Sequence, residues 1–144
     1  HDVAVRFSRC CSPVPGDEIV GFVTRGRGVS IHRTDCINIM NLPMEERVRL
    51  IDAEWQAPEN ESSRERYSTE IQIFANNRIG MFVDISKVFT ERQIDITSMN
   101  VRTSKQGKAT IVMTFDIHGK EELNRLTDKL KQIEGVLDIE RTAG

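Results

Sequence analysis

Residues 67–75 read Tyr67-Ser68-Thr69-Glu70-Ile71-Gln72-Ile73-Phe74-Ala75 and decide the fold of the second half of the chain. Every second residue from Tyr67 onward is apolar or β-branched, which is the period of a half-buried strand. Residues 80–91 follow with large apolar side chains at helical spacing. The change of period from two to about 3.6 residues predicts a strand followed by a helix.

The same two periods predict the remaining elements of this half. Residues 95–103 and 109–117 are predicted strands, joined by a hairpin turn at 104–107. Residues 123–133 carry Leu and Ile along one helical face, and residues 136–141 form the last strand. This order is the ferredoxin-like βαββαβ arrangement, in which two helices cover one face of a four-stranded antiparallel sheet. The open face is partly apolar, so we expect it to pack on a partner.

The composition changes at residues 57–66, a stretch with Pro58 near its start and without a large apolar side chain. We therefore predict a first module at 1–56, a linker at 57–66 and a second domain at 67–144. The predicted strands of the first module are residues 3–7, 19–23, 29–32 and 48–55. Thr34 is the predicted N-cap of a short helix that ends at Asn41. The fold class is α+β, with a small β-rich Cys/His module before the βαββαβ domain.

The composition narrows the function classes. At 38% hydrophobic and 29% charged, the 144 residues are typical of a globular protein, and no apolar run or signal peptide predicts a membrane. A net charge of −2 gives no general basic field, so nucleic-acid contact requires a local patch. Three cysteines, two of them adjacent, favour a reducing, cytoplasmic compartment. Because the chain begins with His1, we expect it to be part of a longer protein.

The first module gathers every cysteine of the chain and one of its histidines, namely Cys10, Cys11, His32 and Cys36. Three thiolates and one imidazole complete the tetrahedral shell of zinc without a position for water, so this site would be structural. Zinc would also stabilise so small a module. Adjacent ligands strain the chelate, however, and buried cysteines that only fill the core remain the alternative. Catalysis is not expected, because no Asn or Asp is placed to orient His32 as a base.

Two turns are candidate binding sites. Arg25, Arg27 and Arg33 crowd around His32 and two glycines; such guanidinium groups suit an RNA backbone, and a solvated loop is the alternative. The second turn joins the first strand of the second domain to its helix and contains Asn77, Arg78, Ile79, Gly80 and Met81. A helix N-terminus attracts anions or a carboxylate, although a plain connecting turn is common.

Two longer stretches carry a family resemblance. They are Arg9-Cys10-Cys11-Ser12-Pro13-Val14-Pro15-Gly16-Asp17-Glu18-Ile19-Val20-Gly21 and Gly26-Arg27-Gly28-Val29-Ser30-Ile31-His32-Arg33-Thr34-Asp35-Cys36. They closely resemble the C-terminal region of the long bacterial RelA/SpoT-type (p)ppGpp synthetase/hydrolases, where a zinc-finger or conserved-cysteine domain precedes an ACT domain. Residues 77–82 resemble the Asp-Arg-x-Gly-Leu-Leu turn of ACT domains, with Asn77 in place of the acidic residue.

The resemblance implies a regulatory role without catalytic residues. The parent would be a GTP pyrophosphokinase or (p)ppGpp pyrophosphohydrolase, with its catalytic domains upstream and under the control of this region. The family resemblance implies docking on the ribosome, where rRNA and uncharged tRNA are the partners. It also favours zinc at the Cys/His quartet and RNA at the three arginines.

For the ACT domain, the resemblance implies a homodimer and an amino-acid ligand at residues 77–81 as an alternative function. Asn77 weakens that expectation, because the carboxylate that would pair with the ammonium group of a ligand is missing. A third interpretation assigns both modules to intramolecular packing that restrains the catalytic half.

Overall fold

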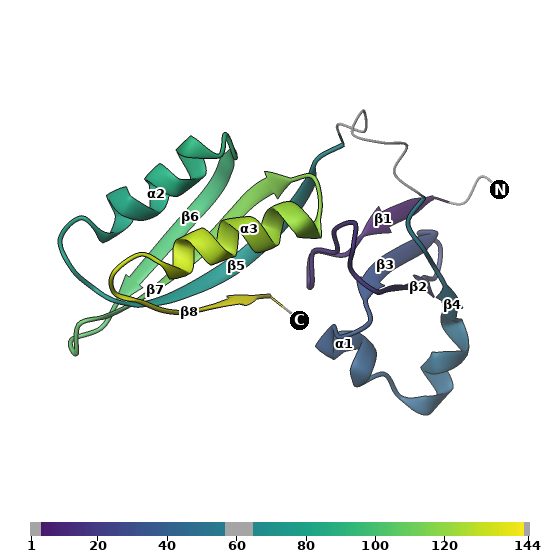
Figure 1. Cartoon of the computed structure of the whole chain (residues 1–144). Coiled ribbons are helices and arrows are strands. Elements are labelled where there is room, and N and C mark those ends of the chain that lie inside the picture. The colour runs from purple at the N-terminus through teal and green to yellow at the C-terminus, as the bar shows by residue number, and fades with distance from the viewer. Residues whose placement is uncertain (1–3, 57–64, 143–144) are drawn as a thin grey trace.

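The computed structural model describes residues 4–56 and 65–142, which form two four-stranded sheets with helices (Figure 1). The elements of the first module are β1 (Val5–Phe7), β2 (Ile19–Val23), β3 (Val29–Arg33), α1 (Ile37–Met40), the 3-10 helix η1 (Met44–Arg49) and β4 (Leu50–Asp52). Its strand order is β1-β3-β2-β4. β1 runs parallel to β3, and the other neighbours are antiparallel. The expected β-rich module is confirmed.

The second domain has the predicted βαββαβ order. Its elements are β5 (Tyr67–Asn76), α2 (Met81–Glu91), β6 (Ile96–Thr103), β7 (Lys108–Ile117), α3 (Lys120–Lys131) and β8 (Val136–Arg141). The sheet is antiparallel in the order β6-β7-β5-β8. Both helices lie on one face of this sheet (Figure 1). The α+β class and the ferredoxin-like arrangement are therefore confirmed.

The core of the second domain follows from the alternation in its two central strands. Ile71 of β5 pairs with Met113 of β7, and both side chains are fully buried beneath the helices. Phe89 of α2 meets Phe115 of β7 edge to face, with ring centroids 5.1 Å apart. Aromatic pairs in this geometry add to the burial energy. The strands and helices thus hold one another through a continuous apolar layer.

Two predictions for the first module are wrong. The helix begins at Ile37 with Cys36 as its N-cap, because the Thr34 N–H still bonds to Glu18 O at 3.0 Å and extends the strand pairing. The predicted strand at 48–55 is shorter, since η1 occupies the chain as far as Arg49 and β4 pairs with β2 only over Leu50–Asp52. The prediction of a linker at 57–66 falls mainly outside the described residues.

The two modules meet at an aromatic contact. Phe7 of β1 stacks on Trp55 with ring centroids 5.4 Å apart. Tyr67, the first residue of β5, lies edge-on to both rings. In this part of the chain the two sheets are therefore joined by packing as well as by the covalent backbone. Among the described residues, no helix has the length and apolar character needed to cross a bilayer.

Candidate metal centre

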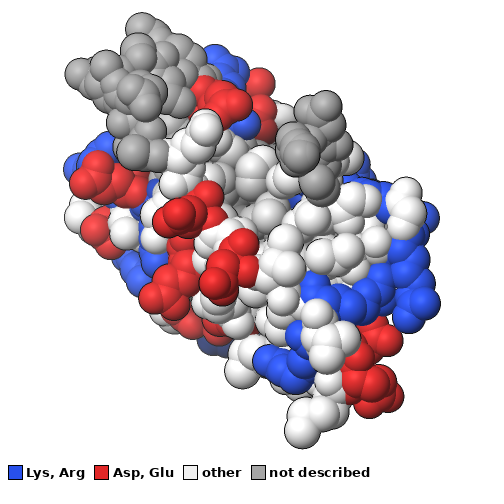
Figure 2. Space-filling view, turned by 90° about the vertical axis from the view of Figure 1, so that its right-hand side faces the viewer, with Lys and Arg blue, Asp and Glu red and all other residues white. Residues whose placement is uncertain are grey.

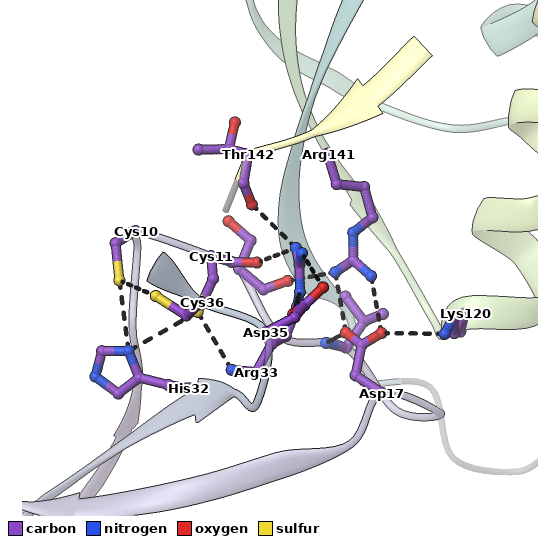
Figure 3. Close-up of polar contacts among 12 residues, drawn as sticks. Cys10, Cys11, Asp17, His32, Arg33, Asp35, Cys36, Lys120, Arg141 and Thr142 are labelled. Atoms are coloured by element: carbon purple, nitrogen blue, oxygen red, sulfur yellow. Dashed lines mark hydrogen bonds and ion pairs between the residues drawn. The ribbon is translucent and has the colours of Figure 1, made fainter. Parts of the chain in front are cut away.

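The structure brings the predicted quartet together. Cys10 and Cys11 follow β1, His32 lies on β3, and Cys36 precedes α1. One ligand atom from each lies within 4.8 Å of all the others. Cys10 Sγ is 3.3 Å from Cys36 Sγ and 3.4 Å from His32 Nδ1, while Cys11 Sγ is 3.9 Å from the same nitrogen (Figure 3).

The backbone turn at residues 8–12 lets the two adjacent cysteines, Cys10 and Cys11, face the same site. The Ser12 N–H donates to Ser8 O at 3.0 Å, and Ser12 itself has a positive φ of 47°. This turn holds both the Cys10 and the Cys11 thiols within reach of His32 Nδ1. Cys36 follows β3, so the four groups converge from three backbone segments.

Burial shifts the pKa values of the metal-donor side chains. It lowers the pKa of His32, which favours the neutral imidazole that binds metals. Burial raises the pKa of Cys11 to about 12 and also raises the pKa of Cys36. For Cys10, hydrogen bonds from Ser8 and other neighbours outweigh burial, and its pKa is lowered. Since metals bind thiolates, a metal ion at this site would displace protons from the buried thiols.

Neighbouring polar groups fix the orientation of two donors. Ser30 Oγ lies 3.1 Å from His32 Nε2, on the side of the ring away from the sulfur atoms. The Arg33 N–H donates to Cys11 Sγ at 3.3 Å. Metal ligands are commonly held by such outer hydrogen bonds. Ser30 is not among the residues predicted from the sequence, although its position two residues before His32 on a strand places it on the same face.

The donor set fits a structural zinc ion. Three sulfur atoms and one imidazole nitrogen satisfy tetrahedral zinc, and soft thiolates favour zinc over magnesium or calcium. Cys11 and Cys36 are fully buried, so a substrate has no path to their sulfur atoms. The arrangement is suited to holding a metal.

The three arginines of the basic turn separate in the structure. Arg25 and Arg27 are exposed on the β2–β3 turn, and the Arg25 side chain is 82% exposed. Arg33 is buried, and its guanidinium donates to Asp35 and to Cys11 O. Arg33 is therefore left out of the proposed RNA contacts, because its donors serve bonds within the chain.

Charges on the first-module side of the molecule are separated. Figure 2 shows basic side chains gathered along one edge of this face and an acidic group nearer its centre. A local basic surface thus exists despite the net charge of −2.

The turn at residues 77–81 is already engaged with the rest of its domain. Arg78 donates to Glu134 O at 2.9 Å, to Ile79 O at 3.1 Å and to Asp84 Oδ2 at 2.8 Å. Met81 is fully buried in the core, whereas Ile79 is fully exposed. Gly80, with φ of 85°, makes the turn into α2. Asn77 N–H donates to Gly107 O. The structure thus gives these residues connecting and packing contacts.

The chain matches two family models. The first, described as the RelA/SpoT RIS domain, matches residues 1–56. The second, described as an ACT domain, matches residues 63–141, which is more than half of the chain.

Curated relatives extend this similarity over both modules. The chain is 39% identical over 139 residues to a GTP pyrophosphokinase of Escherichia coli, covering 96% of this chain and 18% of the relative. It is 37% identical over 139 residues to a bifunctional (p)ppGpp synthase/hydrolase RelA of Mycobacterium tuberculosis, again covering 96% and 18%. The chain thus spans less than a fifth of these proteins. A solved ACT domain from a GTP pyrophosphokinase of Chlorobium tepidum is 25% identical, with a TM-score of 0.48, and covers 54% of this chain and 99% of that one.

Proposed function

Because the chain belongs to the ACT domain family and carries the RIS domain of the RelA/SpoT proteins in front of it, we propose that it is a non-catalytic regulatory region. It belongs to a parent enzyme that makes or hydrolyses (p)ppGpp. Its first module docks on ribosomal RNA or tRNA, and the region controls the catalytic domains upstream. The observation that carries this proposal is the convergence of Cys10, Cys11, His32 and Cys36 in a module that also exposes Arg25 and Arg27 on its β2–β3 turn.

We propose that zinc bound by the Cys/His quartet stabilises the first module and so fixes the position of its β2–β3 turn. The metal would tie the loop after β1 to β3 and to the start of α1, and so fix the strand that leads out of the basic turn. Its role is structural, because the four donors complete the tetrahedral shell.

The basic turn supplies the proposed RNA contacts. Arg25 and Arg27 stand on either side of Gly26, and Gly26 and Gly28 both have positive φ angles. Exposed guanidinium groups on such a turn reach phosphate oxygens, which contribute the salt-dependent part of RNA affinity. Arg25 lies 4.0 Å from Glu46, a distance at which an exposed ion pair is weak. Its charge remains available to a partner.

The double substitution Arg25→Ala/Arg27→Ala is expected to weaken ribosome binding by about tenfold or more and to flatten its salt dependence, because two phosphate contacts are lost. Co-sedimentation of the chain with ribosomes over a series of salt concentrations measures both effects. The matched control is Arg102→Ala/Arg125→Ala, which removes two exposed arginines of the second domain. Equal binding by the two double variants would refute a role for the basic turn.

Ser30→Ala is expected to lower zinc affinity by about tenfold while the fold is retained, because the hydrogen bond that orients His32 is lost. Competition with a chromophoric zinc chelator gives the affinity. Ser68→Ala, an exposed serine of β5, is the control. An unchanged affinity in the Ser30 variant would mean that His32 needs no such support.

Amino-acid sensing by the ACT domain is not included in the proposal. The donors of Arg78 are bonded to Glu134, Ile79 and Asp84 within the domain. Self-association remains a prediction; β6 and β8 are the edges of the sheet through which a second copy would pair.

A further inference from the structure

Residues 12–17, which we call the plug, connect the metal centre to the interior of the second domain. Cys10 and Cys11 precede the plug directly. Val14, three residues after Cys11, has no exposed surface and belongs to the same apolar core as Ile71 and Phe115. The first module therefore contributes to a core that is otherwise built from residues of the second domain. This burial anchors the plug through apolar packing.

A backbone contact anchors the plug at the start of α3. The Lys120 N–H donates to Pro15 O at 2.7 Å. The first N–H groups of a helix have no acceptor within the helix, so the first module satisfies a donor of the second domain. Gly16 lies so close that a Cβ on it would approach Lys120 Cβ to 2.8 Å, and its φ of +105° favours glycine. The conformation of the plug is thus matched to this contact.

An ion pair anchors the end of the plug. The Asp17 side chain is 4% exposed and accepts from Arg141, the last residue of β8, at 2.8 and 2.9 Å (Figure 3). The same carboxylate accepts the Val14 N–H at 2.8 Å. Arg141 also donates to Ser12 O at 2.9 Å. A bidentate Arg–carboxylate pair is directional as well as strong, so it fixes the plug against β8.

Arg33 provides a second connection between the metal centre and β8. It follows the proposed ligand His32, and its guanidinium donates to Cys11 O at 2.9 Å and to Thr142 O at 3.0 Å. Asp35 holds this guanidinium at 2.9 Å. Two of the segments that carry proposed ligands therefore touch the end of the second domain. Movement of the proposed metal-ligating residues would therefore disturb the contact of the plug and the contact of Arg33 with the second domain.

From these contacts we propose that the metal centre controls the docking of the second domain on the first. Bound metal fixes Cys10, Cys11 and His32, and thereby holds the plug and Arg33 against the second domain. Loss of the metal releases both contacts, so the first module is no longer held against the second domain. This inference rests on the proposed metal site. Linkage requires that docking raise the metal affinity by the same factor by which the metal favours docking.

Lys120 and Trp55 report docking directly. The Lys120 amide is bonded to the first module, and Trp55, the single tryptophan of the chain, lies edge-on to Tyr67 of the second domain with ring centroids 5.5 Å apart. The experiment compares the metal-free 144-residue chain under reducing conditions with the same chain after addition of Zn²⁺. We expect zinc to slow hydrogen exchange at the Lys120 amide by about tenfold or more, measured by NMR. We also expect Trp55 emission to shift to shorter wavelength.

Arg141→Met separates docking from metal binding. It is expected to retain stoichiometric zinc binding, to lose the slow exchange at Lys120, and to bind zinc more weakly by the same factor. Asp17→Asn/Arg141→Met removes both charges and guards against misfolding caused by a buried carboxylate that has lost its bidentate partner and keeps only Lys120, 3.9 Å away. Arg125→Met replaces an arginine of α3 that is 57% exposed and is expected to behave as the unmodified chain.

Two different results would overturn the inference, one by refuting the coupling alone and the other by refuting the metal centre as well. Stoichiometric zinc binding that leaves both Lys120 exchange and Trp55 emission unchanged would refute the coupling and leave the metal centre intact. A reduced chain that binds no zinc would refute the metal centre together with the coupling.

Discussion

Cys36→Ser is expected to abolish zinc binding and to unfold the first module, while the second domain stays folded. The buried apolar cluster around the quartet contains only Cys11, Cys36 and Ile39 among the described residues. A core this small supplies little stability, whereas a structural zinc site contributes about 10 kcal/mol or more in small zinc-dependent domains. The dispersion of NMR amide signals from the two modules measures the outcome separately.

Met40→Ser is the matched control for this variant. Met40 is the last residue of α1, the helix that Cys36 caps, but it is 63% exposed and takes no part in the quartet. The control is expected to retain zinc and a dispersed spectrum. Dispersed first-module signals in Cys36→Ser, in the presence or absence of zinc, would show that the module folds without a metal and that the cysteines only fill its core.

Asp17→Ala is expected to destabilise the chain by about 3–5 kcal/mol, because it removes the counter-charge of the Arg141 guanidinium, whose side chain is only 18% exposed. Urea unfolding gives the loss. Asp52→Ala, at an exposed position of β4, is expected to change stability by less than about 0.5 kcal/mol.

A double-mutant cycle isolates the contribution of this ion pair. The sum of the effects of Asp17→Ala and Arg141→Met is expected to exceed the effect of the double variant by roughly 2 kcal/mol or more, since Asp17 is buried and directly bonded to Arg141. Additive effects would show that the two side chains act independently and would argue against the ion pair as an anchor.

The sequence predicts the second domain well because its elements are long and regularly patterned. The alternation around Ile71 and Ile73 marks β5, and the last strand, Val136–Arg141, has the predicted bounds. The first module is harder, since its strands are short and tertiary contacts determine where they end. Val48 was assigned to a strand, yet it lies in η1 with 84% of its surface exposed.

The candidate site was predicted in part. The quartet could be found because Cys and His are rare and chemically distinctive, so their grouping within one module is informative without knowledge of the fold. Arg33 lies among the same glycines and arginines as Arg25 in the sequence, whereas its burial and its hydrogen bond to Thr142 O, 109 residues away, depend on the fold. Asp17 and Arg141 were missed for the same reason. One feature of the sequence could have indicated Asp17: the family motif at residues 9–21 is longer than two metal ligands require.

Zinc content is the most direct test of the account. We predict that the chain, purified under reducing conditions and freed of loosely bound ions, contains about one zinc ion per molecule by elemental analysis. The same analysis is expected to find no zinc in Cys36→Ser and the full amount in Arg25→Ala/Arg27→Ala. A folded chain without zinc, whose three cysteines all react as free thiols, would contradict a structural metal centre.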